Sequence, residues 1–172
     1  MKTTTLALLG SLCLLASCKE KAAPAAPASP ALQQVFATAP AGQPTAIHLA
    51  RTSATPGDTL TVQGVVMGNI KPFVDGRSAF ILGDPEKLTA CNTKPGDSCP
   101  TPWDTCCDTA EDIKIGTATI QVVDAEGKVL KESIENVGGL TKLSKVVVSG
   151  TVAPGSNADL LILNASAIQV AK

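Results

Sequence analysis

Aromatic residues are scarce in this chain. Its 172 residues include three phenylalanines, one tryptophan and no tyrosine. Surfaces that stack nucleic-acid bases are built from aromatic side chains, so this composition argues against a base-binding protein. The formal net charge of -1 agrees, because nucleic-acid-binding domains usually carry an excess of lysine and arginine. We therefore predict that nucleic acid is not a partner.

The sequence also lacks the common signatures of enzymes. It contains no nucleophile elbow, no phosphate-binding loop, no dinucleotide fingerprint and no His-Glu-x-x-His zinc motif. The single histidine, His48, has no nucleophile motif near it in the sequence. These absences predict a protein that is not an enzyme.

No apolar run reaches the ~20 residues that a membrane-spanning helix needs. Residues 6–15 are mostly apolar and follow Lys2, which is the pattern of a signal peptide. The run ends in Leu15-Ala16-Ser17-Cys18. This segment resembles the lipobox of bacterial lipoproteins, which implies cleavage before Cys18 and acylation of Cys18 with chains such as palmitate. A plain secretory signal with an incidental cysteine is the alternative.

The lipobox divides the chain into three parts. Residues 1–17 are the predicted signal peptide. Residues 18–45 hold the lipid anchor and a disordered Ala/Pro-rich linker, because proline restricts the backbone to extended conformations. Residues 46–172 are the predicted folded domain. We expect a membrane-anchored lipoprotein outside the cytoplasm, at the periplasmic face or the cell surface, with an envelope protein as a candidate partner.

Alternation of apolar and polar residues between turn clusters predicts β-strands in the folded domain. A hairpin-like turn at residues 124–127 extends the third run through residues 128–130. Helical turns are predicted only at residues 32–36 and 132–143, and residues 46–50 are a candidate edge strand. The five predicted strands are residues 59–66, 78–82, 117–123, 145–152 and 160–170.

Two of these runs have a glycine inside the strand, Gly64 in the first and Gly150 in the fourth. An interior glycine marks a sharp bend or a bulge. A bent first strand, a hairpin and a late Val-x-Gly-x-Val strand resemble an OB-fold, which is a five-stranded Greek-key barrel. We therefore predict an all-β, small OB-like barrel with a Cys-rich loop inserted at residues 85–112. A small antiparallel sandwich of the same strands is the alternative fold.

The OB-like resemblance also implies a ligand face, since many OB-folds bind oligonucleotides or oligosaccharides. Lys71, Phe73 and Arg77 are the weak candidate contacts, and solvated loop charges with one core phenylalanine explain the same residues. Trp103 is a candidate anchor for a protein partner, because tryptophan is over-represented at binding hot spots. Its alternative role is to cap the cysteine loop against the barrel.

Four cysteines lie close together in the inserted loop: Cys91, Cys99, Cys106 and Cys107. The last three belong to the segment Gly96-Asp97-Ser98-Cys99-Pro100-Thr101-Pro102-Trp103-Asp104-Thr105-Cys106-Cys107. This segment resembles a Gly-Asp-x-Cys-x-Thr-Pro-Trp-Asp-x-Cys-Cys run shared by uncharacterised lipoproteins of planctomycete-like bacteria. The resemblance implies a lipoprotein and transfers no activity.

Three interpretations of these cysteines are open. In an exported protein they favour two disulfides, with Cys91 and Cys99 each pairing with Cys106 or Cys107, because adjacent cysteines are too close for an unstrained bond. Alternatively, four thiolates bind zinc or copper, although the spacing does not match paired zinc knuckles. The third interpretation is redox chemistry at a strained Cys106–Cys107 disulfide.

The acidic residues of the loop are also candidate calcium ligands, although the EF-hand pattern is absent.

Together these observations predict a lipid-anchored cell-envelope protein that acts as a non-catalytic binding or structural module without a cofactor. A metal-binding or thiol-redox lipoprotein is the alternative. An OB-fold binder of nucleic acid or oligosaccharide is a weaker one.

Overall fold

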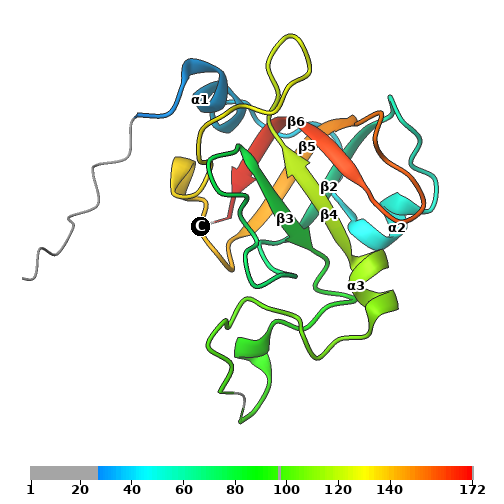
Figure 1. Cartoon of the computed structure of the whole chain (residues 1–172). Helices are drawn as coiled ribbons and strands as arrows, with labels where there is room; N and C mark the ends of the chain where they lie inside the picture. The colour runs from blue at the N-terminus through cyan, green and yellow to red at the C-terminus, as the bar shows by residue number, and fades with distance from the viewer. Residues whose placement is uncertain (1–26, 97, 172) are drawn as a thin grey trace, which may run out of the picture.

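Five strands close into a barrel in the computed structural model of the protein (Figure 1). The structure describes residues 27–96 and 98–171. The strand order is β2-β3-β4-β6-β5, and β2 also pairs with β5, which closes the ring. Only β4 and β6 are parallel neighbours within this ring, so the predicted OB-like barrel is confirmed. The described strands are β1 (Thr45–Ala46), β2 (Thr59–Val65), β3 (Ala79–Gly83), β4 (Thr117–Gln121), β5 (Lys145–Val152) and β6 (Ile162–Val170).

β2 is the strand that closes the barrel. It pairs with β5 along its whole length and with β3 where Val65 lies opposite Gly83. A Cβ on residue 64 would lie 2.6 Å from the Gly83 carbonyl oxygen. The glycine inside this strand therefore stands where two backbones approach too closely for a side chain.

Gly150 lies at a bulge between β5 and β6. The register of the two strands shifts between Ser149 and Gly150. A Cβ on residue 150 would collide with the backbone of Asn164 and Ala165. This is the irregularity that the interior glycine predicted.

Branched aliphatic side chains fill the barrel, as the shortage of aromatic residues requires. Phe80 is fully buried, and its ring centroid lies 6.0 Å from that of Phe73. A smaller apolar cluster of Met67, Leu88 and Ala90 lies where the cysteine loop leaves the barrel. The other large, fully buried side chains are Leu32, Ile47, Leu82, Ile120, Ile134, Leu140, Leu163, Ile168, Val62, Val66 and Val122.

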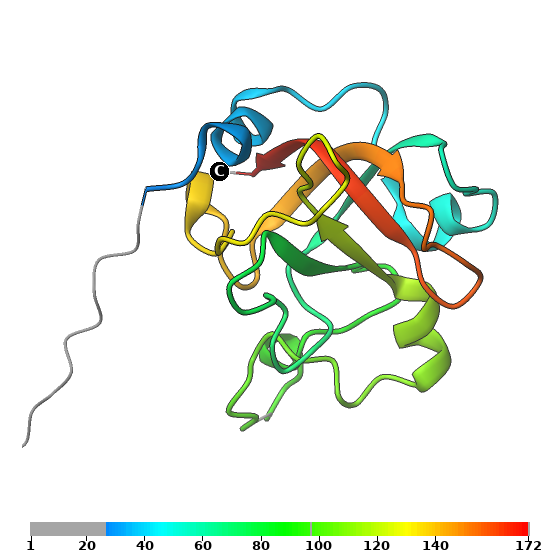
Figure 2. The same ribbon diagram turned by 45° about the horizontal axis from the view of Figure 1, so that its top comes forward.

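A short helix, α1 (Pro30–Ala37), packs against β6 beside the barrel (Figure 1, Figure 2). The Ser29 hydroxyl caps it by accepting the Leu32 N–H at 3.2 Å. Leu32 and Val35 are buried in the main core. The helix confirms the helical turn predicted here, and the packed part of the chain begins inside the segment that the sequence assigns to the linker.

The predicted edge strand at residues 46–50 is wrong beyond its first residue. β1 ends at Ala46, and α2 (Ile47–Arg51) is a helix. The Asp84 carboxylate accepts the His48 backbone N–H at 2.9 Å. This bond satisfies one of the donors that the first turn of a helix leaves unpaired. A carboxylate that is distant in sequence thus supports helix in place of strand.

The segment between β3 and β4 contains regular structure that its composition does not indicate. α3 (Ala110–Gly116) lies beside α2 and leads into β4 (Figure 1), and η1 (Cys91–Thr93) is a single 3-10 turn. The Thr109 hydroxyl caps α3 by accepting the Asp112 N–H at 3.0 Å. The Thr-x-x-Asp spacing is the sequence signal that could have predicted this helix.

The connection from β4 to β5 agrees with its sequence pattern. An isolated bridge joins Val123 to Val129 across the predicted hairpin turn. A second 3-10 turn, η2 (Val137–Gly139), falls inside the helical segment predicted at residues 132–143. No helix in the described part of the chain is long and apolar enough to cross a bilayer.

Replacing Gly150 with alanine is expected to destabilise the fold by roughly 1–3 kcal/mol, the usual cost of overpacking. The new Cβ would meet backbone atoms of Asn164 and Ala165, which cannot rotate away as a side chain can. Thermal unfolding followed by circular dichroism measures the effect. Gly155→Ala is the matched control, because its Cβ would make an ordinary 3.5 Å contact with Ile162. A Gly150→Ala variant as stable as this control would contradict the packing described.

Candidate metal centre

The cysteine loop projects from the barrel between β3 and α3 (Figure 1, Figure 2). Trp103 holds this loop by hydrogen bonds to the segment that follows β2. The indole N–H of Trp103 donates to the Ile70 carbonyl at 2.8 Å, and its own carbonyl accepts the Gly68 N–H at 3.2 Å. The Lys142 ammonium lies 4.6 Å from the centroid of the indole ring. Trp103 thereby joins the loop to the connection between β2 and β3.

Two backbone hydrogen bonds fold the loop onto itself. The Cys91 N–H donates to the Asp104 carbonyl, and the Asn92 N–H donates to the Pro102 carbonyl, both at 2.9 Å. These bonds hold the start of η1 against the segment that leads into Cys106. The loop thus has a defined backbone although it contains no strand.

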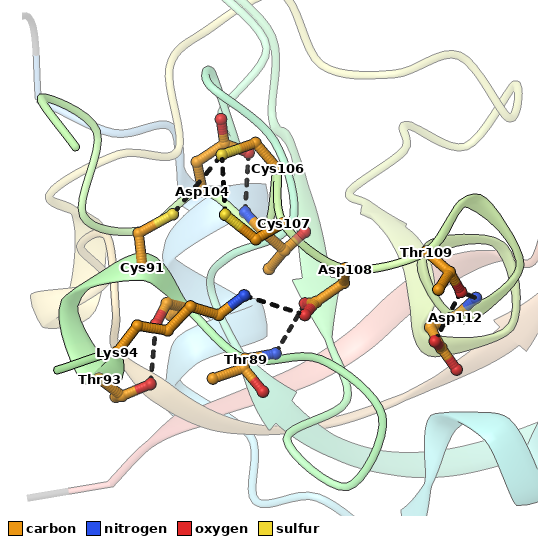
Figure 3. A network of polar contacts seen from close by, with 12 residues as sticks. Thr89, Cys91, Thr93, Lys94, Asp104, Cys106, Cys107, Asp108, Thr109 and Asp112 are labelled. Atoms are coloured by element: carbon orange, nitrogen blue, oxygen red, sulfur yellow. Dashed lines mark hydrogen bonds and ion pairs between the residues drawn. The ribbon is translucent and has the colours of Figure 1, made fainter. Parts of the chain in front are cut away.

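Three thiols converge within this loop, and Figure 3 shows two of them, Cys91 and Cys106, with the neighbouring Cys107. The sulfur atoms of Cys91, Cys99 and Cys106 all lie within 4.8 Å of one another. The Cys91 and Cys106 sulfurs are 3.8 Å apart. The sulfur of Cys107 is 3.9 Å from that of Cys106 but lies outside the mutual set of three. The sequence indicates that the cysteines are neighbours, whereas the fold selects which three meet.

The spacing of the sulfurs suits a single metal ion. Thiolates bound at ~2.3 Å from one ion lie roughly 3.8–4.0 Å apart in tetrahedral or trigonal geometry. The 3.8 Å between Cys91 and Cys106 falls in that range. A disulfide needs sulfurs ~2.05 Å apart, and Cys91, Cys106 and Cys107 are not bonded in this way. The two predicted disulfides stay a prediction.

Burial of the thiols decreases across the cluster. Cys91 is 1% exposed and Cys99 is half-buried, whereas Cys106 and Cys107 are exposed. Burial, together with hydrogen bonds to Cys106 and Cys99, raises the pKa of the Cys91 thiol to about 12. One side of the cluster is therefore shielded from water and the other side faces solvent.

A cation and a carboxylate lie beside the thiols (Figure 3). The Lys94 ammonium is 3.3 Å from Asp108, whose other oxygen accepts the Thr89 N–H at 2.8 Å. Lys94 is close enough to interact electrostatically with Cys91 and Cys107. Its charge offsets the negative charge that thiolates would place in the loop.

The Thr105 hydroxyl is a buried polar group with no hydrogen-bond partner among the described residues. The residue is 1% exposed, and buried hydroxyls nearly always find an acceptor. Thr105 directly precedes Cys106 in the chain. The loop therefore holds one unsatisfied buried hydroxyl beside its cysteines in the sequence.

The weak candidates on the first hairpin do not join this site. Lys71 is exposed and pairs with Asp75 at 3.0 Å, and Arg77 is also exposed. Phe73 is 7% exposed and packs on Phe80, so its ring offers no free face to a ligand. Within the described residues, the loop carboxylates form no cluster that could hold a cation.

The sequence gives no hint of one polar pair, the half-buried His48 and the buried Asp84. One Asp84 oxygen lies 2.7 Å from His48 Nδ1 and also accepts the His48 backbone N–H, while the other accepts the Glu86 N–H at 2.9 Å. Burial alone would raise the pKa of Asp84, but these hydrogen bonds outweigh it and lower the pKa below its ordinary value. No motif links two residues so far apart. Within the described residues no hydroxyl or thiol hydrogen-bonds to His48, so the pair does not form a catalytic triad.

The predicted acylation residue, Cys18, lies outside the described residues.

Comparison of the chain with protein-family models, with curated proteins and with solved structures finds no match. The geometry of the site is therefore the main guide to function.

Acid is expected to remove the stabilisation that Asp84 provides. Because folding lowers its pKa, this contribution is fully present above the unfolded value of ~3.9 and is lost as the pH falls through the folded value. Asp84→Asn is expected to cost roughly 1–3 kcal/mol near neutral pH, because it disturbs a buried hydrogen-bonded group. Urea unfolding at a series of acidic to neutral pH values measures both effects.

Asp75→Asn is the control for this experiment, since an exposed ion pair contributes at most ~1 kcal/mol. The gap in stability between wild type and Asp84→Asn should narrow as the pH falls. A gap that stays constant down to acid pH would contradict a charged Asp84 as its source.

Proposed function

We propose that this protein is a lipid-anchored, non-catalytic binding module of the cell envelope, and that its cysteine loop binds a thiophilic metal ion, copper(I). The observation that carries this proposal is the approach of three sulfurs to within 4.8 Å of one another. Thiolates are soft ligands that select copper(I) and zinc rather than calcium or magnesium.

The number of converging ligands favours copper(I) over zinc. Structural zinc sites are almost always four-coordinate. Among the residues that the structure describes, only Cys91, Cys99 and Cys106 lie mutually close, and Cys107 stands outside the set. A site with three converging soft sulfurs suits copper(I) better than four-coordinate zinc.

The surroundings of the thiols support a built site. Cys91 is held by the backbone bond to Asp104 and is shielded from water. Three thiolates around a monovalent ion would leave excess negative charge, which Lys94 lies close enough to offset. Trp103 limits the movement of the loop that carries the ligands. These features lower the entropy that the loop would lose on binding an ion.

The envelope location is supported by the sequence. The signal-peptide pattern and the lipobox resemblance together imply an exported chain acylated at Cys18. The barrel then serves as the scaffold that presents the loop to the extracytoplasmic space. Since thiols outside the cytoplasm tend to oxidise, a bound ion would also protect them from disulfide formation.

One copper(I) ion per chain is expected to bind to the reduced, full-length protein in mild detergent without oxygen. Cys91→Ser and Cys106→Ser should each weaken binding by ~100-fold or more, because each removes one of the three converging sulfurs. Native mass spectrometry gives the stoichiometry, and competition with a chromogenic chelator gives the affinity. Trp103, the only tryptophan, reports the state of the loop by its fluorescence.

Ser98→Ala is the control variant, because it changes an exposed residue of the same loop and leaves all four sulfurs. It should bind copper(I) as the wild type does. A reduced wild type that binds no copper(I), together with a non-reduced mass that shows two disulfides, would contradict the proposal. Stoichiometric zinc in place of copper(I) would overturn the choice of metal.

Changing Cys18 to alanine is expected to abolish acylation and to release the protein from membranes. Cys18 is the proposed attachment point, and the described part of the chain offers no membrane-spanning helix. Labelling with an alkyne analogue of palmitate and membrane fractionation measure the two effects. Cys13→Ala, which falls inside the predicted signal peptide, should leave both unchanged. Label that persists in the Cys18→Ala variant would refute acylation at this cysteine.

A further inference from the structure

We propose that Cys107 is an exchange ligand through which the bound copper(I) leaves the site for an acceptor that carries thiolates. This inference rests on the proposed metal-binding function and assigns a distinct role to the cysteine that stands outside the set of three. The acceptor is defined by its chemistry, which is a pair of soft sulfur ligands accessible to solvent.

The position of Cys107 carries the argument. Its sulfur is 3.9 Å from the Cys106 sulfur, which is a distance that two ligands of one ion can have. It is nevertheless not within 4.8 Å of all three converging sulfurs. Cys107 can therefore share an ion with Cys106 after a small movement, but it does not complete a tetrahedron around the resting position of the ion.

The burial of the thiols gives the exchange a direction. Cys91 is shielded from water, whereas Cys106 and Cys107 are adjacent in the chain and both exposed. An acceptor can reach an ion held by Cys106 and Cys107 more easily than one held by Cys91. Transfer therefore proceeds from the buried side of the cluster to the exposed side.

The exchange replaces one copper–sulfur bond at a time. Cys107 loses its thiol proton as its sulfur binds the ion, and Cys91 takes up a proton as its bond to the ion breaks. The first thiolate of the acceptor then displaces Cys99 and the second displaces Cys106. The bond to Cys107 breaks last, which leaves the ion on the two sulfurs of the acceptor, and each released cysteine takes up a proton. Copper stays in the +1 state throughout, so no oxidant or reductant takes part. Lys94 lies near both Cys91 and Cys107, where its charge can offset the thiolate of either.

The test measures the affinity for copper(I) and the rate of its transfer separately. The full-length protein and its Cys107→Ser variant are loaded with one equivalent of copper(I) without oxygen. Stopped-flow absorbance then follows transfer to an excess of bathocuproine disulfonate, a chromogenic copper(I) chelator, and to dithiothreitol, a dithiol. We expect Cys107→Ser to keep the stoichiometry and to bind with nearly wild-type affinity. Its transfer rate should fall by roughly tenfold or more, because the associative route is lost.

Matched variants make the outcomes distinct. Cys106→Ser, the adjacent residue with the same substitution, should lose affinity, whereas Ser98→Ala should change neither affinity nor rate. Cys107→Met keeps a soft sulfur ligand and should recover most of the rate. Circular dichroism and Trp103 fluorescence confirm that each variant is folded.

Three results would overturn the inference and leave copper binding intact. The first is an unchanged transfer rate in Cys107→Ser. The second is a loss of affinity in Cys107→Ser as large as that in Cys106→Ser, since Cys107 would then be a fixed fourth ligand. The third is a Cys107→Met variant as slow as Cys107→Ser. Absence of copper binding in the wild type would instead contradict the function on which the inference rests.

Discussion

The pairing of β2 with both β5 and β3 is the constraint on which the structure depends. β2 runs along β5 for its whole length and meets β3 at Val65, and this contact turns a sheet into a closed barrel. Closure is sterically possible because Gly64 has no side chain to meet the Gly83 backbone. It also leaves no open edge between β2 and its neighbours. The connection that leaves β2 then carries Gly68 and Ile70, the backbone partners of Trp103.

The candidate metal centre follows from this arrangement. A loop rich in proline, glycine and aspartate has little regular structure with which to hold four cysteines in place. Trp103 fastens it to the barrel, and the Cys91–Asp104 bond brings its two halves together. Sulfurs from both halves then meet at 3.8 Å. A barrel core of aliphatic residues supplies the rigid support, whereas the ligands lie on the loop, as is common for functional sites.

Much of this fold could be predicted from the sequence because strands have local signals. The alternation of apolar and polar residues located all five barrel strands, and the interior glycine at position 150 predicted the bulge. The prediction failed where a distant group decides the local structure. Residues 47–51 are helical partly because Asp84, far away in sequence, accepts the His48 N–H. The Thr-x-x-Asp pattern that caps α3 is visible in the sequence. It was not used to predict a helix because the segment around it has the composition of a loop.

The sequence by itself determined the strand content, the positions of the interior glycines and the presence of four neighbouring cysteines. These are properties of periodicity, composition and short motifs, which do not depend on what lies elsewhere in the chain. Only the tertiary structure decided that Cys91, Cys99 and Cys106 converge while Cys107 stands apart, and that Phe73 is buried rather than exposed. The reason is physical: these relations depend on how the loop docks on the barrel, and docking is set by packing and backbone hydrogen bonds between segments that local sequence does not connect.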